Sequence, residues 1–348
     1  MRAAVFETFR GPIDIRRVAD PACAPDGVIV EVEACGVCRS DYHAWNGADA
    51  DLKLPHVMGH EMAGIVVEAG PQSGWRKGAR VTAPFILGCG HCQDCRSGQS
   101  TLCDHQEVLG FSGWGAFAQY VAVPNAPFNV VRLPDDLDFV DAAGMGCRVT
   151  TAYRALTERG RLTEGEWLCV HGCGGIGLSA IAIAKSLGAA VIAVDINDEA
   201  LAIAKELGAD ICLKASASSA QTLVEAIQDS SGGGAHVSLD ALGHTETFQT
   251  SLRSLRKGGR HLQIGLPIGP HAVQSLPLLD LVYSRQISIL GSRGISPQGF
   301  SGLFNMITAG HLQLDQLVSR RIKLNEVGEA IASFDTFTSA GVTVVDEF

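Results

Sequence analysis

The sequence predicts an α/β protein with two domains, in which a β-rich domain is joined to a doubly wound parallel sheet. At 348 residues the chain is too long for one ordinary core. Charged residues make up 18% and apolar residues 46%, and 40 glycines provide many turns, which is typical of a folded globular chain. Near residue 141 the pattern changes from strands and turns to strands that alternate with helices.

The first domain, which we place at residues 1–148, is rich in strands and turns. Residues 28–33 and 65–68 have the β-branched, alternating pattern of strands, and glycines lie between and after them. No stretch with helical periodicity longer than about two turns occurs before residue 136.

Strands and helices alternate through the second domain, which we place at residues 149–290. A helix is expected at 150–158, and further helices at 176–187, 197–207, 220–227 and 245–255. Six buried strands are expected at 168–170, 190–194, 210–213, 236–240, 261–264 and 287–290. This alternation predicts a parallel sheet with helices on both faces. After it the pattern loosens, and we expect residues 291–348 to return to the first domain.

The glycine-rich segment after the first of these strands has the spacing of a dinucleotide-binding loop. Gly172 makes the tight turn, Gly174 lets the backbone approach a pyrophosphate, and Gly177 lets helix and strand pack closely. Asp195, at the end of the next strand, can accept hydrogen bonds from a ribose, or it can cap the following helix. A glycine-rich connection without a ligand is the alternative for the loop. The expected cofactor residues are Gly172, Gly174, Gly175, Ile176, Gly177 and Asp195.

Eleven cysteines and the absence of a signal-peptide pattern at the N-terminus indicate a cytoplasmic protein with reduced thiols. Four cysteines form two successive Cys-x-x-Cys spacings and a fourth position eight residues later. They are Cys89, Cys92, Cys95 and Cys103. Four thiolates complete a tetrahedral shell, so we expect a structural zinc in a lobe at about residues 88–104. A redox pair and a chance spacing are the alternatives.

The charge of the chain limits the classes of partner. A formal net charge of −10 argues against nucleic acid and against an anionic membrane surface. The most apolar stretch, residues 180–194, is broken by Lys185 and Gly188, so no membrane-spanning helix is expected.

Further motifs give the chain a resemblance to a known family. Cys38-Arg-Ser-Asp41, Gly59-His-Glu61, the four-cysteine lobe, Cys147 with Thr151 and the glycine loop occur in a characteristic order. That order resembles the zinc-dependent alcohol dehydrogenases of the medium-chain dehydrogenase/reductase superfamily over nearly the whole chain. The resemblance implies a GroES-like catalytic domain and a Rossmann cofactor domain, with NAD as cofactor and two zinc ions per chain.

The resemblance also implies a second metal centre, which spacing alone could not assemble. Cys38, His60 and Cys147 would bind a catalytic zinc and leave one position open for water or substrate. Glu61 would lie beside this metal and could ligate it transiently, and Asp41 would orient the liganding histidine. Zinc with an open position acts as a Lewis acid toward an alcohol.

Other roles follow from the resemblance in the same way. Ser40 and His43 resemble a proton relay, although a surface histidine is the alternative for His43. Arg39 resembles a contact to the cofactor pyrophosphate, and Thr151 and Leu266 resemble residues that flank the nicotinamide. The residues expected at the substrate pocket are Phe85, with Trp45 and Trp114 as weaker candidates.

One departure from the family pattern concerns the C-terminus. The family often has Gly-Arg before its last strand, with the arginine on the cofactor phosphates, whereas this chain has Gly341-Val342. The chain is also short, like the microbial members, which implies a homotetramer, with a homodimer as the alternative.

Three functions compete. The first is an NAD-dependent alcohol dehydrogenase that interconverts an alcohol and an aldehyde or ketone, either a simple alcohol or, in the polyol branch, a polyol or other secondary alcohol. The second is a zinc-free reductase of the same fold, which the complete set Cys38, His60 and Cys147 disfavours. The third is a catalytically silent NAD-binding protein, which Ser40 and His43 disfavour. The physiological alcohol is not fixed by the sequence, and Asp195 favours NAD over NADP.

Overall fold

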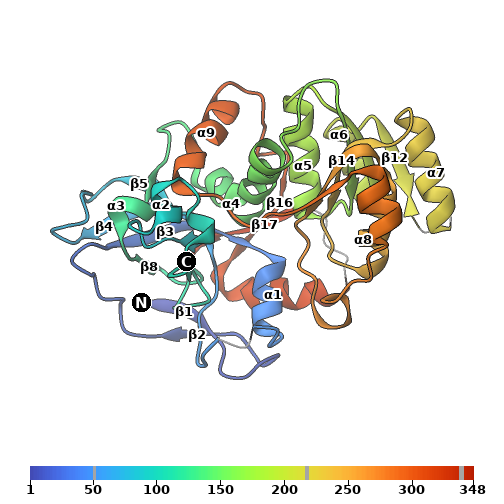
Figure 1. The fold of residues 1–348 in the computed structure, drawn as a ribbon. Helices are drawn as coiled ribbons and strands as arrows, with labels where there is room; N and C mark the ends of the chain where they lie inside the picture. Colours follow the sequence, from blue (N-terminus) through green and yellow to red (C-terminus); the bar gives the residue numbers. More distant parts are fainter. Residues whose placement is uncertain (50–51, 216–218, 337–340) are drawn as a thin grey trace. The chain divides into compact units, whose positions relative to one another are not determined.

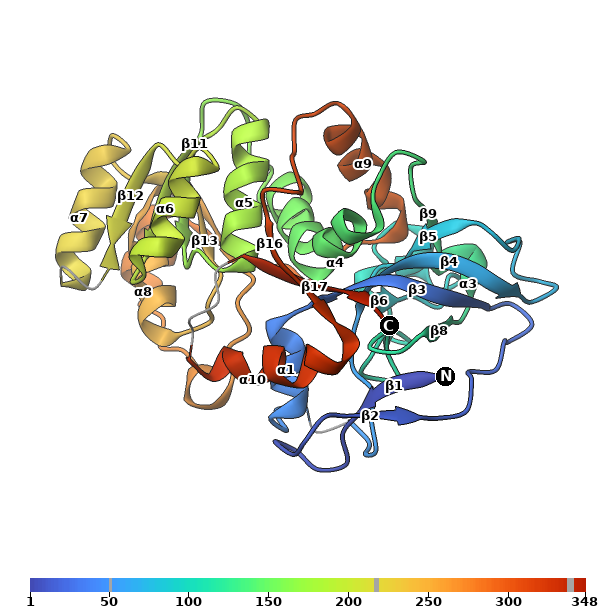
Figure 2. The ribbon, with the colours of Figure 1, turned by 180° about the vertical axis from the view of Figure 1, so that it is seen from behind.

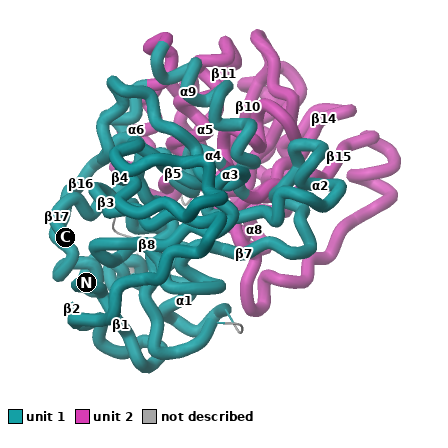
Figure 3. The backbone as a smooth tube through the Cα atoms, turned by 90° about the vertical axis from the view of Figure 1, so that its left-hand side faces the viewer, with its two compact units in different colours: residues 1–150, 294–308, 313–348 teal, residues 151–293, 309–312 magenta. Residues whose placement is uncertain are grey.

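The structure is a computed structural model that describes the chain apart from residues 50–51, 216–218 and 337–340. The described residues form two compact units (Figures 1 and 3). Unit 1 comprises Met1–Thr150, Gly294–Thr308 and Gln313–Phe348. Unit 2 comprises Thr151–Arg293 and Ala309–Leu312. No helix in the described part of the chain is long and apolar enough to cross a membrane.

Unit 1 is built on a sheet of seven strands in the order β16-β17-β3-β4-β5-β9, with β8 also paired to β3. The strands are β3 (Val28–Val37), β4 (Glu61–Ala69), β5 (Arg80–Thr82), β8 (Tyr120–Val123), β9 (Val131–Arg132), β16 (Val318–Lys323) and β17 (Val342–Glu347). Two small sheets pair β1 (Arg2–Val5) with β2 (Asp14–Arg17) and β6 (Ile86–Leu87) with β7 (Glu107–Val108).

Strand β3 is the centre of this sheet because it has three partners. One edge pairs antiparallel with β4, while the other edge is shared by β8, opposite Val28–Glu31, and β17, opposite Cys35–Val37. The buried side chains of these strands pack with those of β1 and the neighbouring loops, among them Phe6, Met58 and Phe117, which are fully enclosed. This packing fixes the carboxyl end of β3, from which Cys38 follows directly.

Short helices complete unit 1. They are α1 (Arg39–Trp45), α2 (Gln93–Arg96), α3 (Ala126–Asn129), α9 (Phe300–Thr308) and α10 (Val327–Ala332), while α4 (Phe139–Arg154) continues into unit 2. The 3-10 turns are Ser100–Leu102, Pro297–Gly299, Leu324–Glu326 and Ser333–Thr336. Helix α4 is kinked at Gly146, which has φ −8° and ψ −113°, so the residues after it leave the direction of the first turns.

Unit 2 contains a six-stranded parallel sheet in the order β12-β11-β10-β13-β14-β15. Its strands are β10 (Trp167–His171), β11 (Ala190–Asp195), β12 (Ile211–Lys214), β13 (Ala235–Asp240), β14 (Leu255–Gln263) and β15 (Ser288–Gly291). The strand order reverses beside β10, as in a Rossmann fold, and ligands of such sheets bind at the carboxyl ends of the strands at that point. The predicted doubly wound sheet is confirmed.

Helices cover both faces of this sheet (Figure 2). Helices α5 (Gly175–Ser186) and α6 (Asp198–Glu206) pack on β10, β11 and β12, and α7 (Ala220–Ser230) and α8 (Thr245–Arg253) pack on the other face. Ile192 and Val194 of β11 share a buried cluster with Leu223 and Ile227 of α7. Val191 and Ala193 between them are buried as well, which explains why this strand is a continuous apolar run. Turns of π or 3-10 type occur at Ala155–Arg159, Gly269–His271 and Leu278–Tyr283.

Two element boundaries differ from the prediction by more than four residues. Helix α4 begins at Phe139 rather than at residue 150, because Oδ1 of Asp138 accepts the peptide N–H of Val140 and so caps the first turn. Strand β14 begins at Leu255 rather than at residue 261. Leu255 still pairs with Ala235, and the register then shifts, so the predicted glycine turn lies inside a bulged strand.

A buried polar network lies within unit 2 on β10, β13, β14 and α8. His171 Nε2 lies 3.3 Å from Cys169 Sγ and 3.4 Å from Ser254 Oγ. Nδ1 of His261 lies 3.0 Å from Ser251 Oγ. Burial, with a contribution from His261, lowers the pKa of His171 to about 3, so this imidazole is neutral at physiological pH.

Candidate metal centres and cofactor loop

The first candidate site in unit 1 joins residues that are far apart in the sequence. Cys38 follows β3 and caps α1, His60 precedes β4, Glu61 begins β4, and Cys147 follows the kink of α4. One ligand atom from each of these four residues lies within 4.8 Å of the others. Cys38, His60 and Glu61 are buried, and Cys147 is partly buried. The fold therefore assembles the set that spacing alone could not.

Asp41 orients this site from the first turn of α1. Its Oδ1 lies 3.0 Å from His60 Nδ1, and its Oδ2 accepts the peptide N–H of Cys38 at 2.9 Å. The imidazole therefore presents Nε2 to the cluster. Among the described residues this buried atom has no hydrogen-bond partner. A buried nitrogen that faces two cysteine sulfurs and lacks a partner is suited to a metal, so the donor set fits zinc.

A contact within the cluster favours the thiolate form of Cys38. The hydrogen bond from Cys147 holds the pKa of Cys38 well below its usual range against the opposing effect of burial, and the same contact, together with burial, raises the pKa of Cys147. The proton is therefore lost first from Cys38. A thiolate is the form of cysteine that ligates a metal.

Glu61 is held by two donors on α4. Its Oε1 accepts the peptide N–H of Cys147 at 2.9 Å, and its Oε2 forms an ion pair with the guanidinium of Arg148. Burial raises the pKa of Glu61 to about 7, although Arg148 acts in the opposite direction. Arg148 is a residue of the site that the sequence prediction missed.

Ser40 and His43 lie on α1, beside the cluster. The Oγ of Ser40 is 3.3 Å from the Sγ of Cys38, so the hydroxyl is close to the position that a metal ligand would occupy. Within the described part of the chain, Nδ1 of His43 is buried without a hydrogen-bond partner. Burial, assisted by Arg39, lowers the pKa of His43 below its ordinary 6.5, so the ring is neutral near physiological pH.

Aromatic rings flank His60. The ring centroid of Phe85 lies 5.8 Å from that of His60, and the centroid of Phe111 lies 5.4 Å from it on an edge-to-face approach. Phe111 was not predicted, since a lone phenylalanine between glycine-rich turns carries no recognisable signal. The two tryptophans have other contacts: Nε1 of Trp45 donates to Gly11 O at 2.8 Å, and Nε1 of the half-exposed Trp114 donates to Pro55 O at 3.3 Å.

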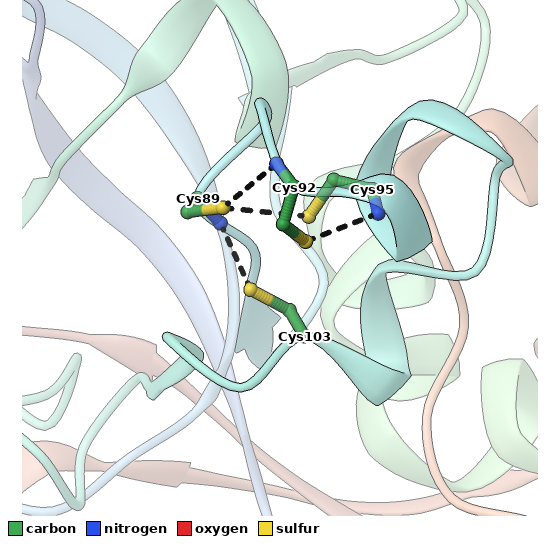
Figure 4. A group of neighbouring side chains, drawn as sticks. All are labelled: Cys89, Cys92, Cys95 and Cys103. Atoms are coloured by element: carbon green, nitrogen blue, oxygen red, sulfur yellow. Dashed lines mark hydrogen bonds between the residues drawn. The ribbon is translucent and has the colours of Figure 1, made fainter.

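The second candidate site is the four-cysteine lobe, whose members face one another (Figure 4). The Sγ atoms of Cys89 and Cys95 are 4.0 Å apart, and the ligand atoms of all four cysteines lie within 4.8 Å of one another. Peptide N–H groups support three of the sulfurs: Cys92 donates to Cys89, Cys95 to Cys92, and Cys89 to Cys103, at 3.4–3.5 Å. All four cysteines are free thiols.

Backbone donors favour a thiolate in this lobe. The pKa of Cys89 is lowered to about 6, chiefly by a hydrogen bond from the peptide N–H of His91. Burial, in contrast, raises the pKa of Cys95 to about 12. The ring Nδ1 of His91 pairs with the carbonyl oxygen of Cys89 instead of joining the sulfurs. Four sulfurs, with no fifth ligand beside them among the residues that the structure describes, form a closed, structural type of metal site.

The glycine loop in unit 2 has the geometry that its spacing predicts. Gly172 has φ +96°, a left-handed conformation that glycine adopts without strain. A Cβ on Gly177 would lie 1.8 Å from the carbonyl oxygen of Gly172, so the close contact of helix and strand requires glycine there. A Cβ on Gly174 would meet nothing within 4 Å, so the backbone of the loop is open at this point. Helix α5 begins at Gly175 without a side-chain cap, which leaves its first N–H groups available to phosphate.

Asp195 ends β11 beside this loop. Its Oδ2 accepts the peptide N–H of Cys173 at 2.6 Å, and its Oδ1 accepts that of Asn197 at 2.8 Å. Asn197, rather than Asp195, is the N-cap of α6. Thr151 is buried on α4, and Leu266, which follows β14, is 57% exposed. In unit 1, Nη1 of Arg39 donates to the carbonyl oxygen of Phe334 at 3.3 Å.

Comparison with known proteins agrees with this arrangement. The family model of the alcohol dehydrogenase GroES-like domain matches residues 24–135, and that of the zinc-binding dehydrogenase matches residues 175–309. An alcohol dehydrogenase of Geobacillus stearothermophilus is 38% identical over 296 residues, which cover 84% of each chain. The chain belongs to the zinc-type medium-chain alcohol dehydrogenases. The predicted resemblance and the predicted combination of GroES-like and Rossmann folds are thereby confirmed.

Two further relatives of this medium-chain alcohol dehydrogenase cover nearly all of it. An NAD-dependent alcohol dehydrogenase of Saccharolobus solfataricus is 32% identical, with 99% of each chain covered. The solved alcohol dehydrogenase of Thermus sp. ATN1 is 29% identical over the full length of both chains, with a TM-score of 0.90. The fold and the length of the chain are therefore those of the family.

Proposed function

We propose that the protein is an NAD-dependent and zinc-dependent alcohol dehydrogenase, which reversibly oxidises an alcohol to an aldehyde or ketone. The observation that carries this proposal is the cluster of Cys38, His60 and Cys147, in which His60 presents an unpartnered Nε2. Membership of the family and the names of relatives, one of them NAD-dependent, support the same activity. Unit 1 would be the catalytic domain and unit 2 the cofactor domain.

Two zinc ions per chain are part of the proposal. Cys38, His60 and Cys147 would hold a catalytic zinc, which supplies a Lewis acid to the alcohol oxygen. Cys89, Cys92, Cys95 and Cys103 would hold a structural zinc, because four protein sulfurs leave no open position. Phe85 and Phe111 would exclude water from the alcohol next to His60.

The hydroxyl proton of the alcohol needs a path out of this site. Ser40 would accept it first, because its Oγ lies beside Cys38, and His43 would receive it next. The lowered pKa of His43 supports this role, since a neutral imidazole can take up a proton.

The glycine loop and Asp195 would bind NAD in unit 2. The N–H groups at the start of α5 would bind the pyrophosphate, assisted by Arg39, and Asp195 would accept hydrogen bonds from the ribose. Thr151 and Leu266 would flank the nicotinamide, which would supply the acceptor for a hydride from the alcohol. The carboxylate of Asp195 would repel the 2′-phosphate of NADP.

We also propose a homotetramer, with a homodimer as the alternative, in the reducing cytoplasm. Large apolar side chains of unit 2 are exposed in the turn Leu278–Tyr283, which precedes the edge strand β15 in the chain, among them Leu279 at 67% and Tyr283 at 77%. Exposed large apolar side chains and an edge strand are features that an interface between copies of a chain would cover. A reducing compartment would keep the cysteine ligands free of disulfides.

A turnover screen tests the activity. The purified protein is assayed with primary, secondary, aromatic and polyol alcohols, each with NAD and with NADP, while its zinc content is measured. We expect NAD-dependent turnover with at least one simple alcohol and two zinc ions per chain. Cys38→Ser should lose one zinc and all turnover and remain folded. Turnover retained by Cys38→Ser, or a wild type that is inactive with every class although it holds two zinc ions, would contradict the proposal.

A further inference from the structure

Arg148 has no part in the function proposed above, although it lies directly beside a proposed zinc ligand. It follows Cys147 on α4 and is 5% exposed. Its Nη1 donates to the carbonyl oxygen of Val37 at 3.0 Å, and its Nη2 donates to Oε2 of Glu61. A buried guanidinium with two such anchors has little freedom to move.

The side chain of Glu61 occupies a slot whose walls are two glycines. A Cβ on Gly36 would lie 2.0 Å from Oε2 of Glu61, and one on Gly146 would lie 2.4 Å from its Cβ. The open end of the slot is closed by the peptide N–H of Cys147, which donates to Oε1. Each carboxylate oxygen therefore has a donor, and both donors come from adjacent residues of α4.

The proposed metal cluster offers this carboxylate a second binding partner. One oxygen of Glu61 is within 4.8 Å of the ligand atoms of Cys38, His60 and Cys147. A carboxylate is an ordinary zinc ligand, and a buried carboxylate without a counter-charge is strongly unfavourable. Glu61 can therefore be satisfied either by Arg148 or by a cation bound at the cluster. The contacts of Arg148 stabilise the first state.

We propose that Arg148 is a positioning residue that holds Glu61 away from the catalytic metal and so keeps the fourth coordination position open for the alcohol. This inference rests on the proposed function, because it requires a metal at Cys38, His60 and Cys147. The peptide N–H of Cys147 assists, but it is uncharged. Arg148 therefore provides most of the attraction that competes with the metal.

Cobalt substitution tests this role, since the visible absorption of Co²⁺ depends on its ligands. Co²⁺ is placed at the catalytic cluster of the holoprotein, with zinc left in the four-cysteine lobe. In Arg148→Met we expect an altered cobalt spectrum and a KM for alcohol that rises by about tenfold to a hundredfold, because alcohol must displace Glu61. The KM for NAD should change little. The double variant Arg148→Met/Glu61→Gln should return the cobalt spectrum to that of the wild type.

Three further variants make the result specific. Arg148→Lys keeps the charge but cannot bond both Val37 and Glu61 as the planar guanidinium does. Its cobalt spectrum and its KM for alcohol should therefore lie between those of the wild type and Arg148→Met. Arg154→Met is the matched control, because Arg154 lies on the same helix, is also 5% exposed and pairs with Glu158 instead. It should leave the cobalt spectrum unchanged. Glu61→Gln alone should also leave it unchanged, because Glu61 is not a ligand while Arg148 is present.

Two results would overturn the role of Arg148. One is an unchanged cobalt spectrum in folded Arg148→Met. The other is an altered spectrum in Glu61→Gln alone, a measurement that stands even if Arg148→Met does not fold. Failure of the proposed function looks different, because the wild type would then bind no metal at the cluster or turn over no alcohol.

Discussion

Asp41 and His60 form a fully enclosed pair, in which Oδ1 of the carboxylate lies 3.0 Å from Nδ1 of the imidazole. The same carboxylate also accepts the peptide N–H groups of Cys38 and Gly59. One side chain on α1 therefore orients two of the three proposed ligands of the catalytic zinc. The tautomer with the proton on Nδ1 follows from this contact and leaves the lone pair of Nε2 for the metal.

The first prediction is that Asp41→Asn weakens metal binding at this centre selectively. The amide of asparagine can accept one of these hydrogen bonds but carries no charge that would orient the imidazole. The affinity of this centre for zinc should therefore fall about tenfold to a hundredfold. Competition with a chelator measures this, and the zinc of the four-cysteine lobe is the internal reference. Equal affinity in wild type and variant would contradict the orienting role of Asp41.

The second prediction concerns the four-cysteine lobe. Cys95→Ser should remove one zinc ion and lower the midpoint of thermal unfolding, because a closed metal site contributes its binding free energy to folding. The metal at Cys38, His60 and Cys147 should remain. Cys169→Ala is the control, since Cys169 is equally enclosed but belongs to neither cluster. A Cys95→Ser protein with two zinc ions would refute a structural site.

The third prediction is that His43→Ala slows alcohol oxidation by about tenfold or more near pH 6 to 7, where bulk base is scarce. The pKa of His43 is lowered by burial, so the wild-type imidazole stays neutral and able to accept a proton to a pH below its ordinary 6.5. Metal content should not change, and imidazole buffers should restore part of the rate. His311→Ala, at an exposed position, should behave as wild type. A parental pH profile in His43→Ala would exclude the relay.

The fourth prediction is a preference for NAD over NADP in kcat/KM of about tenfold or more, because Asp195 carries a charge at the ribose position. Asp195→Asn keeps an oxygen that can accept from Asn197 and removes the charge, so the preference should narrow. The alternative is that Asp195 serves only the backbone through Cys173 and Asn197. In that case the stability of Asp195→Asn would fall, while the ratio of kcat/KM with NAD to kcat/KM with NADP would stay the same.

The fifth prediction concerns acid stability. His171 has a pKa of about 3 in the folded chain, whereas an unfolded histidine has about 6.5. Above 6.5 neither state is protonated. As the pH falls below 6.5 only the unfolded state gains a proton, so stability declines until about pH 3. At pH 5 this contribution is about 2 kcal/mol.

Denaturant unfolding at pH 7 and pH 5 measures this effect. Between pH 7 and pH 5 the free energy of unfolding of His171→Asn should fall by about 2 kcal/mol less than that of the wild type, because asparagine cannot bind the proton. Exposed His311→Asn should follow the wild type. Identical pH dependence in all three proteins would show that His171 does not limit acid stability.

The parts of the fold and site that the sequence predicts well are set by short-range signals. The glycine loop is contiguous, and the four cysteines lie within one lobe, so spacing alone carries their geometry. The six strands of unit 2 are long enough, and regular enough in their alternation with helices, to be recognised. In unit 1, several strands have only two or three residues and pair with distant segments, so no local sequence pattern predicts them.

The residues that escaped prediction depend on tertiary contacts. Helix α1 was missed because its N-cap is Cys38, which is not among the usual capping residues, and because the helix has only seven residues. Arg148 gave no signal because its position depends on the kink at Gly146 and on the slot of Glu61. Phe111 likewise gains its role only by lying beside His60.

The strand β17 has a consequence for how the protein is made. It pairs with β3, which precedes unit 2 in the chain, but it is translated after the whole of unit 2. Unit 1 therefore cannot finish its sheet until the last residues of β17 emerge, whereas the main segment of unit 2 is available earlier and without interruption. Until β17 emerges, the edge of β3 beyond its pairing with β8 stays open to other strands, so the nascent chain is exposed to aggregation while unit 2 is being made.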